Sequence, residues 1–134
     1  MNYIDGFVIA VPTANKQEFI EHAQLVDSLL IELGATRVVE CWGDDVRDGK
    51  VTDFRKAVQA EDDETVVFSF VEWPDKETRD AASAKMTDWM NNPKEADPRM
   101  DPEKHPMPFD GKRLIYGGFE PLVELASGPK GKEA

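Results

Sequence analysis

Three features of this sequence predict an α+β fold of the ferredoxin-like kind. Four segments are rich in β-branched and aromatic residues, and two longer segments carry apolar residues at helical spacing. Their order along the 134 residues is β-α-β-β-α-β, with a short helical turn between the second and third strands. This is the order of the split βαβ arrangement, an antiparallel βαββαβ sheet of four strands with two helices on one face.

The first strand and the first helix come from the N-terminal quarter. Residues 3–11 predict a strand in which both alternating sets of side chains are largely apolar. Pro12 ends this strand, and Thr13 or Asn15 can cap the helix that follows. Gly34 suits the left-handed position after the helix. The apolar residues that define this helix are Phe19, Ala23, Val26, Leu30 and Leu33.

The second and third strands flank an acidic segment. Residues 36–42 predict the second strand, and residues 65–73, the stretch richest in β-forming residues, predict the third. Residues 43–64 between them are polar and contain several turn signals. Within that segment, residues 52–58 predict a two-turn helix capped by Thr52.

The last third of the chain contains a second helix, a long loop and a closing strand. The helix is predicted over residues 75–91. Residues 92–108 form a proline-rich loop, and loops of this length often bind ligands or cover a site. Residues 110–123 begin with an Asp-Gly turn and carry Gly117 and Gly118 inside the closing strand. Such glycines indicate either a bend of the strand or the close approach of another group.

The balance between strands and helices predicts a homodimer. Both faces of the sheet are largely apolar, but the two long helices suffice to cover one face. The simplest cover for the other face is the same face of a second copy, related by a two-fold axis. We therefore expect residues 1–125 to form a single domain that pairs as a dimeric α+β barrel, and residues 126–134 to be a disordered tail.

Composition excludes several classes of function. The formal net charge of −11 repels nucleic acids and anionic membranes. No apolar run is long enough to span a membrane and no signal peptide is recognisable, so the cytoplasm is the expected compartment. Cys41 is the only cysteine and is expected to be a buried, inert thiol. No metal-binding motif is present, so we expect neither a metal nor a cofactor.

Carboxylates on the predicted strands are the first candidates for chemistry, namely Asp5, Glu40 and Glu72. A carboxylate on an apolar face must be hydrogen-bonded, paired with a cation or raised in pKa, and a raised pKa suits a general base. Exposure at the end of a strand is a further alternative, to which Glu72 is best suited. The structural alternative is a salt bridge with one of three arginines, Arg37, Arg79 or Arg113.

Four aromatic or imidazole side chains are candidates for a cleft between sheet and helices. Trp42 offers a flat wall, and the Tyr116 hydroxyl can donate a hydrogen bond to a developing enolate. Both residues are equally compatible with core packing. His22 falls inside the apolar arc of the first helix, either as a packed core residue or as a base. His105 lies in the long loop, where it either closes over the cleft or stays solvated.

Five stretches of the sequence together carry a resemblance to a known family. They are YIDGFV at residues 3–8, ECWGDDV at 40–46, DGKVTDF at 48–54, VFSFVEWP at 67–74 and FDGKRLIYGGF at 109–119. They resemble the signatures of the YbaA-like family, a bacterial family of unknown function, over roughly residues 1–123. The resemblance implies the dimeric α+β barrel superfamily, which includes cofactor-free monooxygenases, isomerases, haem enzymes and plain binding proteins. It supplies no catalytic motif.

Two functions follow as hypotheses. In the favoured one, each protomer of a homodimer binds a small apolar ligand between sheet and helices, under the 92–108 loop, through Trp42, Tyr116 and His105. If this site is catalytic, we expect cofactor-free proton transfer or oxygenation of a carbonyl or phenolic substrate. The base would then be Asp5, Glu40 or His22, with Tyr116 and Trp42 binding the substrate. The second hypothesis is a non-catalytic dimer that binds protein partners through its acidic rim.

Overall fold

The computed structural model describes residues 2–128 and contains the predicted antiparallel sheet. Its strands are β1 (Tyr3–Pro12), β2 (Arg37–Trp42), β3 (Glu64–Trp73) and β4 (Ile115–Phe119). Its α-helices are α1 (Lys16–Glu32), α2 (Phe54–Ala57) and α3 (Lys76–Asn91), and two short 3₁₀ turns are η1 (Thr13–Asn15) and η2 (Pro98–Met100). The strand order is β2-β3-β1-β4, and every pairing is antiparallel. The predicted ferredoxin-like α+β architecture is confirmed.

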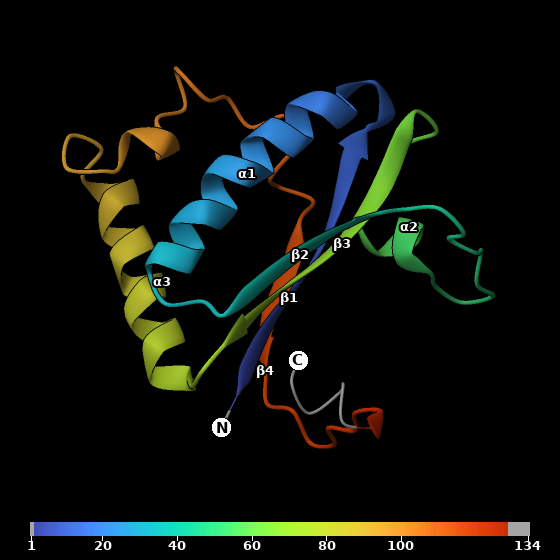
Figure 1. Cartoon of the computed structure of the whole chain (residues 1–134). Helices are drawn as coiled ribbons and strands as arrows, with labels where there is room; N and C mark the ends of the chain where they lie inside the picture. The colour runs from blue at the N-terminus through green and yellow to red at the C-terminus, as the bar shows by residue number, and fades with distance from the viewer. Residues whose placement is uncertain (1, 129–134) are drawn as a thin grey trace.

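The two long helices lie on one side of the sheet, and α2 lies on the other side (Figure 1). We call these sides the helix face and the open face. Residues paired across antiparallel strands point to the same face. The register therefore places Phe7 of β1, Ser69 of β3 and Tyr116 of β4 on the helix face. It places Gly6 of β1 and Gly117 of β4 together on the open face.

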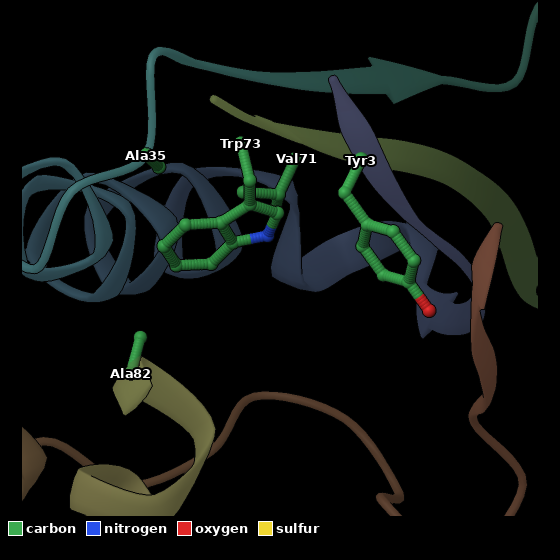
Figure 2. Packing of buried hydrophobic residues seen from close by; sticks show 5 residues of the cluster. All are labelled: Tyr3, Ala35, Val71, Trp73 and Ala82. Carbon is green, nitrogen blue, oxygen red and sulfur yellow. The ribbon is translucent and has the colours of Figure 1, made fainter. Parts of the chain in front are cut away.

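The core lies between the sheet and the two long helices. Figure 2 shows one part of it, where the indole of Trp73 lies between Ala35, which follows α1, and Ala82 of α3. A second part packs around Phe19, near the other end of α1, and comprises Ile9, Val11, Phe19, Ala23 and Val67. Each of the large side chains in these clusters contributes about 1.5–3 kcal/mol of hydrophobic stabilisation. These contacts hold α1 against the sheet and thereby shape the space beside it.

The start of α1 differs from the sequence prediction. Neither Thr13 nor Asn15 caps the helix with its side chain. The Thr13 hydroxyl instead lies 2.7 Å from the hydroxyl of Thr65 on β3. The Asn15 amide donates to the backbone carbonyl of Pro108, at 3.0 Å. Long-range partners thus compete successfully with local capping, which ties the end of the 92–108 loop to the start of α1.

The other helix ends follow local chemistry. Asp53, not Thr52, caps α2, because its carboxylate accepts a hydrogen bond from the backbone N–H of Lys56 at 2.7 Å. Asp75 caps α3 by accepting from the backbone N–H of Thr78. Gly34 follows α1 with a φ of 116°, as predicted for a left-handed position.

Gly117 accommodates an aromatic ring on the open face. It pairs with Gly6 across β1 and β4. The ring of Phe119 lies over both glycines, so that an added Cβ would be 3.6 Å from it at Gly117 and 3.5 Å at Gly6. These are ordinary contact distances, so a small side chain at Gly117 would fit beside the Phe119 ring without displacing it.

Gly118 allows other side chains to lie much closer to the backbone on the helix face. It pairs with Asp5, and an added Cβ would lie 2.7 Å from Nη2 of Arg79 and 2.8 Å from Cε2 of Tyr3. Neither adjacent glycine has a positive φ, so backbone strain does not explain the pair. The close approach that the sequence indicates is made here by the chain's own side chains.

Replacing Gly118 with alanine is expected to destabilise the protein by about 1–3 kcal/mol, because the methyl group must displace the packed Tyr3 or Arg79. The matched change Gly117→Ala is expected to stay within about 0.5 kcal/mol, since its methyl group meets only ordinary contacts. Urea unfolding of both variants measures the difference. Equal destabilisation by the two changes would contradict this account of the glycine pair.

The open face is only partly covered. Val58, just after α2, packs against Ala10 and Val66 at one end of the sheet. Away from that end, large apolar side chains stay exposed, with Phe68 at 44% and Phe119 at 60% of their full exposure. Exposed apolar patches of this kind mark interaction surfaces.

Candidate functional site

Two adjoining spaces flank α1. The outer groove, of about 530 Å³, lies between α1 and the edge strand β2, and its lining includes Lys16, Ile20, Gln24, Ser28 and Ile31 together with Val38 and Trp42. The inner cavity, of about 130 Å³, lies between α1 and the helix face of the sheet, and its lining includes Phe7, His22, Val26, Ser69 and Phe109. Four residues line both spaces, namely Phe19, Ala23, Asp27 and Glu40. The boundary between them therefore carries two carboxyl groups.

Asp27 of α1 and Glu40 of β2 form a carboxyl pair whose side chains lie within hydrogen-bonding reach. Burial, followed by the hydrogen bond and the charge of Glu40, raises the pKa of Asp27 to about 9. Oε1 of Glu40 is buried and has no hydrogen-bond donor among residues 2–128. Two carboxylates at this separation cannot both ionise cheaply, so the pair retains one proton at neutral pH.

Two other buried carboxylates, those of Asp5 and Glu64, are neutralised by arginine. Asp5 is 7% exposed, and its carboxylate lies 2.9 Å from Nη2 of Arg79 and accepts from the Trp73 indole at 3.0 Å. Glu64 is 6% exposed and accepts two hydrogen bonds from Arg113, each of 2.6 Å. Among the described residues, neither Asp27 nor Glu40 has an ion pair of this kind. The carboxyl pair therefore differs chemically from these structural ion pairs.

Asp5 and Tyr116 lie away from both spaces. Tyr116 is 70% exposed, and its ring stacks on Phe7 with the centroids 5.8 Å apart. Asp5, Arg79 and Tyr116 all line a third groove, of about 360 Å³, between α3 and β4. Asp5 takes the structural alternative that the sequence left open, an ion pair with Arg79. Glu72 does likewise with Arg37 at 3.9 Å, in a partly exposed position.

Trp42 lines the outer groove, beside Glu40 on the same strand. Its ring lies 6.3 Å from that of Phe19, centroid to centroid. The ammonium of Lys16 lies 5.4 Å from the centre of the Trp42 ring, within the range of a cation–π contact. Trp42 thus forms an aromatic wall of the groove whose face already attracts a cation.

His22 lines the inner cavity and faces Phe109 edge-on, with the ring centroids 6.1 Å apart. Its Nδ1 is buried and has no hydrogen-bond partner in the described part of the chain. Burial, and to a lesser degree the charge of His105, lowers the pKa of His22. His22 is therefore neutral at pH 7, and His105 acts on it through charge without lining either space.

The 92–108 loop is fastened to α1 but does not line the outer groove or the inner cavity. Arg99 of the loop donates to both carboxylate oxygens of Glu32, near the end of α1. Asn15 holds the carbonyl of Pro108 at the other end of the helix. Phe109, which follows the loop, lines the inner cavity and packs against Phe19 and His22.

Sequence reasoning missed two residues of this arrangement. Asp27 stands four residues after Ala23 and eight after Phe19, so it continues their apolar stripe along α1. That i, i+4, i+8 spacing is a signal that was available in the sequence. Phe109 carried no such signal, because its contact with His22 depends on where the long loop returns to the sheet.

Three sequence expectations concern metals, membranes and Cys41. Residues 2–128 hold no group of three or more His, Cys, Asp or Glu side chains placed to bind a metal ion. No helix in that part of the chain combines the length and the apolar character needed to cross a bilayer. The prediction that Cys41 is buried is wrong. It is exposed, because it alternates with the groove residues Glu40 and Trp42 and so points to the open face of edge strand β2.

The fold and the site define a ferredoxin-like α+β protein with an acid-lined groove beside its first helix. A solved structure described as a dimeric ferredoxin-like protein, from an uncultured marine organism, matches it with a TM-score of 0.51 at 11% sequence identity. The match covers 92% of this chain and 96% of that one, and supports the fold.

The sequence comparisons are more specific. The model of the family described as "Protein of unknown function (DUF1428)" matches residues 2–111, and the chain belongs to this family. Its relatives include the proteins called "Uncharacterized protein YbaA" of Escherichia coli strain K12 and of Shigella flexneri. Each is 54% identical over 124 residues, which cover 92% of this chain and 99% of the relative. The resemblance to the YbaA-like family is confirmed.

Proposed function

We propose that this protein binds a small molecule in the outer groove, with the apolar body of the ligand against Trp42 and its polar head against the Asp27–Glu40 pair. The observation that supports this most is a groove of about 530 Å³ beside a half-buried carboxyl pair that no arginine neutralises. Its volume lies in the range of about 300–1,000 Å³ that is usual for small-molecule pockets, and its wall is mainly apolar.

Binding in the groove is testable by blocking it. Ser28 is exposed and lines the groove, so Ser28→Trp is expected to fill it without disturbing the core. In a thermal-shift screen of small phenolic, lactone, carbonyl and amine compounds, we expect hits that Ser28→Trp abolishes. Tyr116→Phe is the control, because Tyr116 lies outside the groove. A screen without hits, or with hits that persist in Ser28→Trp and disappear in Tyr116→Phe, would reject this site.

A second candidate function is cofactor-free proton transfer. The supporting observation is that the carboxyl pair retains one proton at neutral pH, so that one carboxyl group can donate a proton while the other accepts one. Glu40 would take a proton from a carbon next to a carbonyl, and Asp27 would donate its proton to the carbonyl oxygen. Exchange of solvent deuterium into simple ketones, followed by NMR, measures this activity. Glu40→Gln is expected to reduce it by about 10²-fold or more, and an absence of exchange in the parent protein contradicts the enzyme.

We further propose that the protein is a homodimer joined through its open face. Ile4, Phe68, Phe70, Phe119 and Pro121 line a shallow apolar groove of about 430 Å³ on that face. Beyond β4 the chain exposes more apolar side chains, with Leu122 at 92% and Leu125 at 92% exposure. The solved structure of the same fold is described as dimeric, which favours the same arrangement here. A second copy would bury this surface from water.

Sedimentation at about 10 μM is expected to show a dimer of the parent chain. Phe119→Asp is expected to shift it to a monomer, because two carboxylates would face an apolar interface. Met90→Asp is the matched control, since Met90 is also exposed but lies on α3, on the opposite side of the sheet. A monomeric parent chain, or equal effects of the two changes, would contradict the interface.

A further inference from the structure

The outer groove contains acceptors that have no positively charged partner within residues 2–128. Asp5 and Glu64 each meet an arginine, but the Asp27–Glu40 pair does not. In the part of the chain that the structure describes, Oε1 of Glu40 is buried without a donor, and Nδ1 of His22 has no hydrogen-bond partner in the adjoining cavity. A ligand that donates hydrogen bonds and carries positive charge would complete this site in the way that arginine completes the others.

The other groups around the groove favour the same ligand chemistry. Of residues 2–128, Lys16 is the only basic residue whose side chain lines the outer groove, and its ammonium lies over the Trp42 ring rather than in an ion pair with Asp27 or Glu40. The aromatic face is therefore suited to cations as well as to apolar groups. The formal net charge of −11 attracts cations and repels anions over a longer range.

We infer that the ligand of the outer groove is an organic cation, with a protonated amine, amidine or guanidine head between Asp27 and Glu40 and an apolar body against Trp42. This inference rests on the proposed small-molecule site. In the empty protein, one proton reduces the charge of the carboxyl pair. The bound cation takes over that role, and the displaced proton passes to solvent.

Proton displacement makes binding dependent on pH. The charged and titratable groups that line the two spaces beside the pair are Lys16 and His22 on α1. His105 on the loop lines neither space and acts on His22 through its charge. Between about pH 7 and 8.5 the pair still retains its proton in the empty protein, because the pKa of Asp27 is raised to about 9. Affinity for a cation that stays charged in this range is expected to rise up to about tenfold per pH unit.

Three ligands of nearly equal shape test the charge of the head group. Benzamidine is a cation, benzamide is neutral and benzoate is an anion. By calorimetry at pH 8 we expect benzamidine to bind at least tenfold more tightly than benzamide, and benzoate not to bind. Titrations in two buffers of different ionisation enthalpy are expected to show release of up to one proton per benzamidine.

Variants that keep the shape of the side chains show whether Asp27 and Glu40 are responsible for cation binding and proton release. The double change Asp27→Asn and Glu40→Gln is expected to abolish benzamidine binding while the groove keeps its shape. Asp27→Asn alone is expected to abolish proton release, since Glu40 no longer shares a proton with a second carboxyl group. Glu21→Gln removes one exposed carboxylate from α1 outside the groove. It is expected to change neither benzamidine binding nor proton release.

The outcomes separate this inference from the proposed site. If benzamide or benzoate binds as tightly as benzamidine, and Ser28→Trp blocks that binding, the groove is a ligand site. The inference that its ligand is a cation is then wrong. If the only compounds of the screen whose binding Ser28→Trp blocks are uncharged, the inference of a cationic ligand is also wrong. If no compound of any charge binds, the proposed function fails with it.

Discussion

Replacement of Arg79 with methionine is expected to destabilise the protein by about 3–5 kcal/mol, because Asp5 then remains buried without a cation. The Asp5 side chain is 10% exposed and that of Arg79 is 20% exposed. Three contacts join them, with Nε of Arg79 at 3.1 Å from Oδ1 and 3.3 Å from Oδ2, and Nη2 at 2.9 Å from Oδ1. Methionine preserves much of the side-chain volume, so the expected loss reflects charge rather than packing.

A matched surface pair supplies the control. Lys76 and Asp80 are joined at 3.1 Å on the same helix, but their side chains are 61% and 47% exposed. Lys76→Met is expected to change stability by about 0.5 kcal/mol or less. Adding Asp5→Asn to Arg79→Met is expected to recover part of the loss, since the buried charge disappears. Urea unfolding at pH 7 measures each change, and a loss for Arg79→Met as small as that for Lys76→Met would contradict a buried ion pair.

Replacement of Asp27 with asparagine is expected to stabilise the protein at alkaline pH. The pKa of Asp27 is raised in the folded state to about 9 from its ordinary value of 3.8, chiefly by burial. The folded protein therefore holds a proton that the unfolded chain releases. The contribution of Asp27 to the free energy of unfolding is fully present below about pH 4. It is lost progressively up to about pH 9, at no more than about 1.4 kcal/mol per pH unit.

Asparagine has the shape of the protonated acid but carries no charge at any pH. We expect Asp27→Asn to flatten the decline of stability with pH, with a gain on the order of 2 kcal/mol between pH 5 and pH 8. Thermal unfolding at several pH values measures this slope. Glu21→Gln, on the exposed side of α1, is expected to leave the slope of the parent protein unchanged. A parent-like slope in Asp27→Asn would show that the carboxyl pair does not hold a proton in the folded protein.

Much of the fold could be predicted because it depends on local patterns. The apolar stripe from Phe19 to Leu33 specifies a helix, and the β-forming residues of β3 specify a strand, both through properties of a single segment. Gly34 marked the end of α1 for a similarly local reason, since its positive φ disfavours other residues. The capping of α1 could not be predicted, because Asn15 found a partner 93 residues away.

The candidate site was predicted less completely. Glu40, Trp42 and His22 were recognised as candidates and do lie around α1, whereas Asp5 and Tyr116 lie along a different groove. Asp27 was missed because a single acid on a helix is ordinarily solvated, whereas here burial and, to a lesser degree, its neighbour Glu40 raise its pKa.

The sequence by itself determined the order of the elements, the two apolar faces of the sheet and the acidic charge of the molecule. Only the tertiary structure decided which carboxylates meet a cation. Asp5 meets Arg79 across 74 residues and Glu64 meets Arg113 across 49, whereas Asp27 meets another acid. The physical reason is that periodicity is a property of one segment, but an ion pair depends on strand register and helix position together.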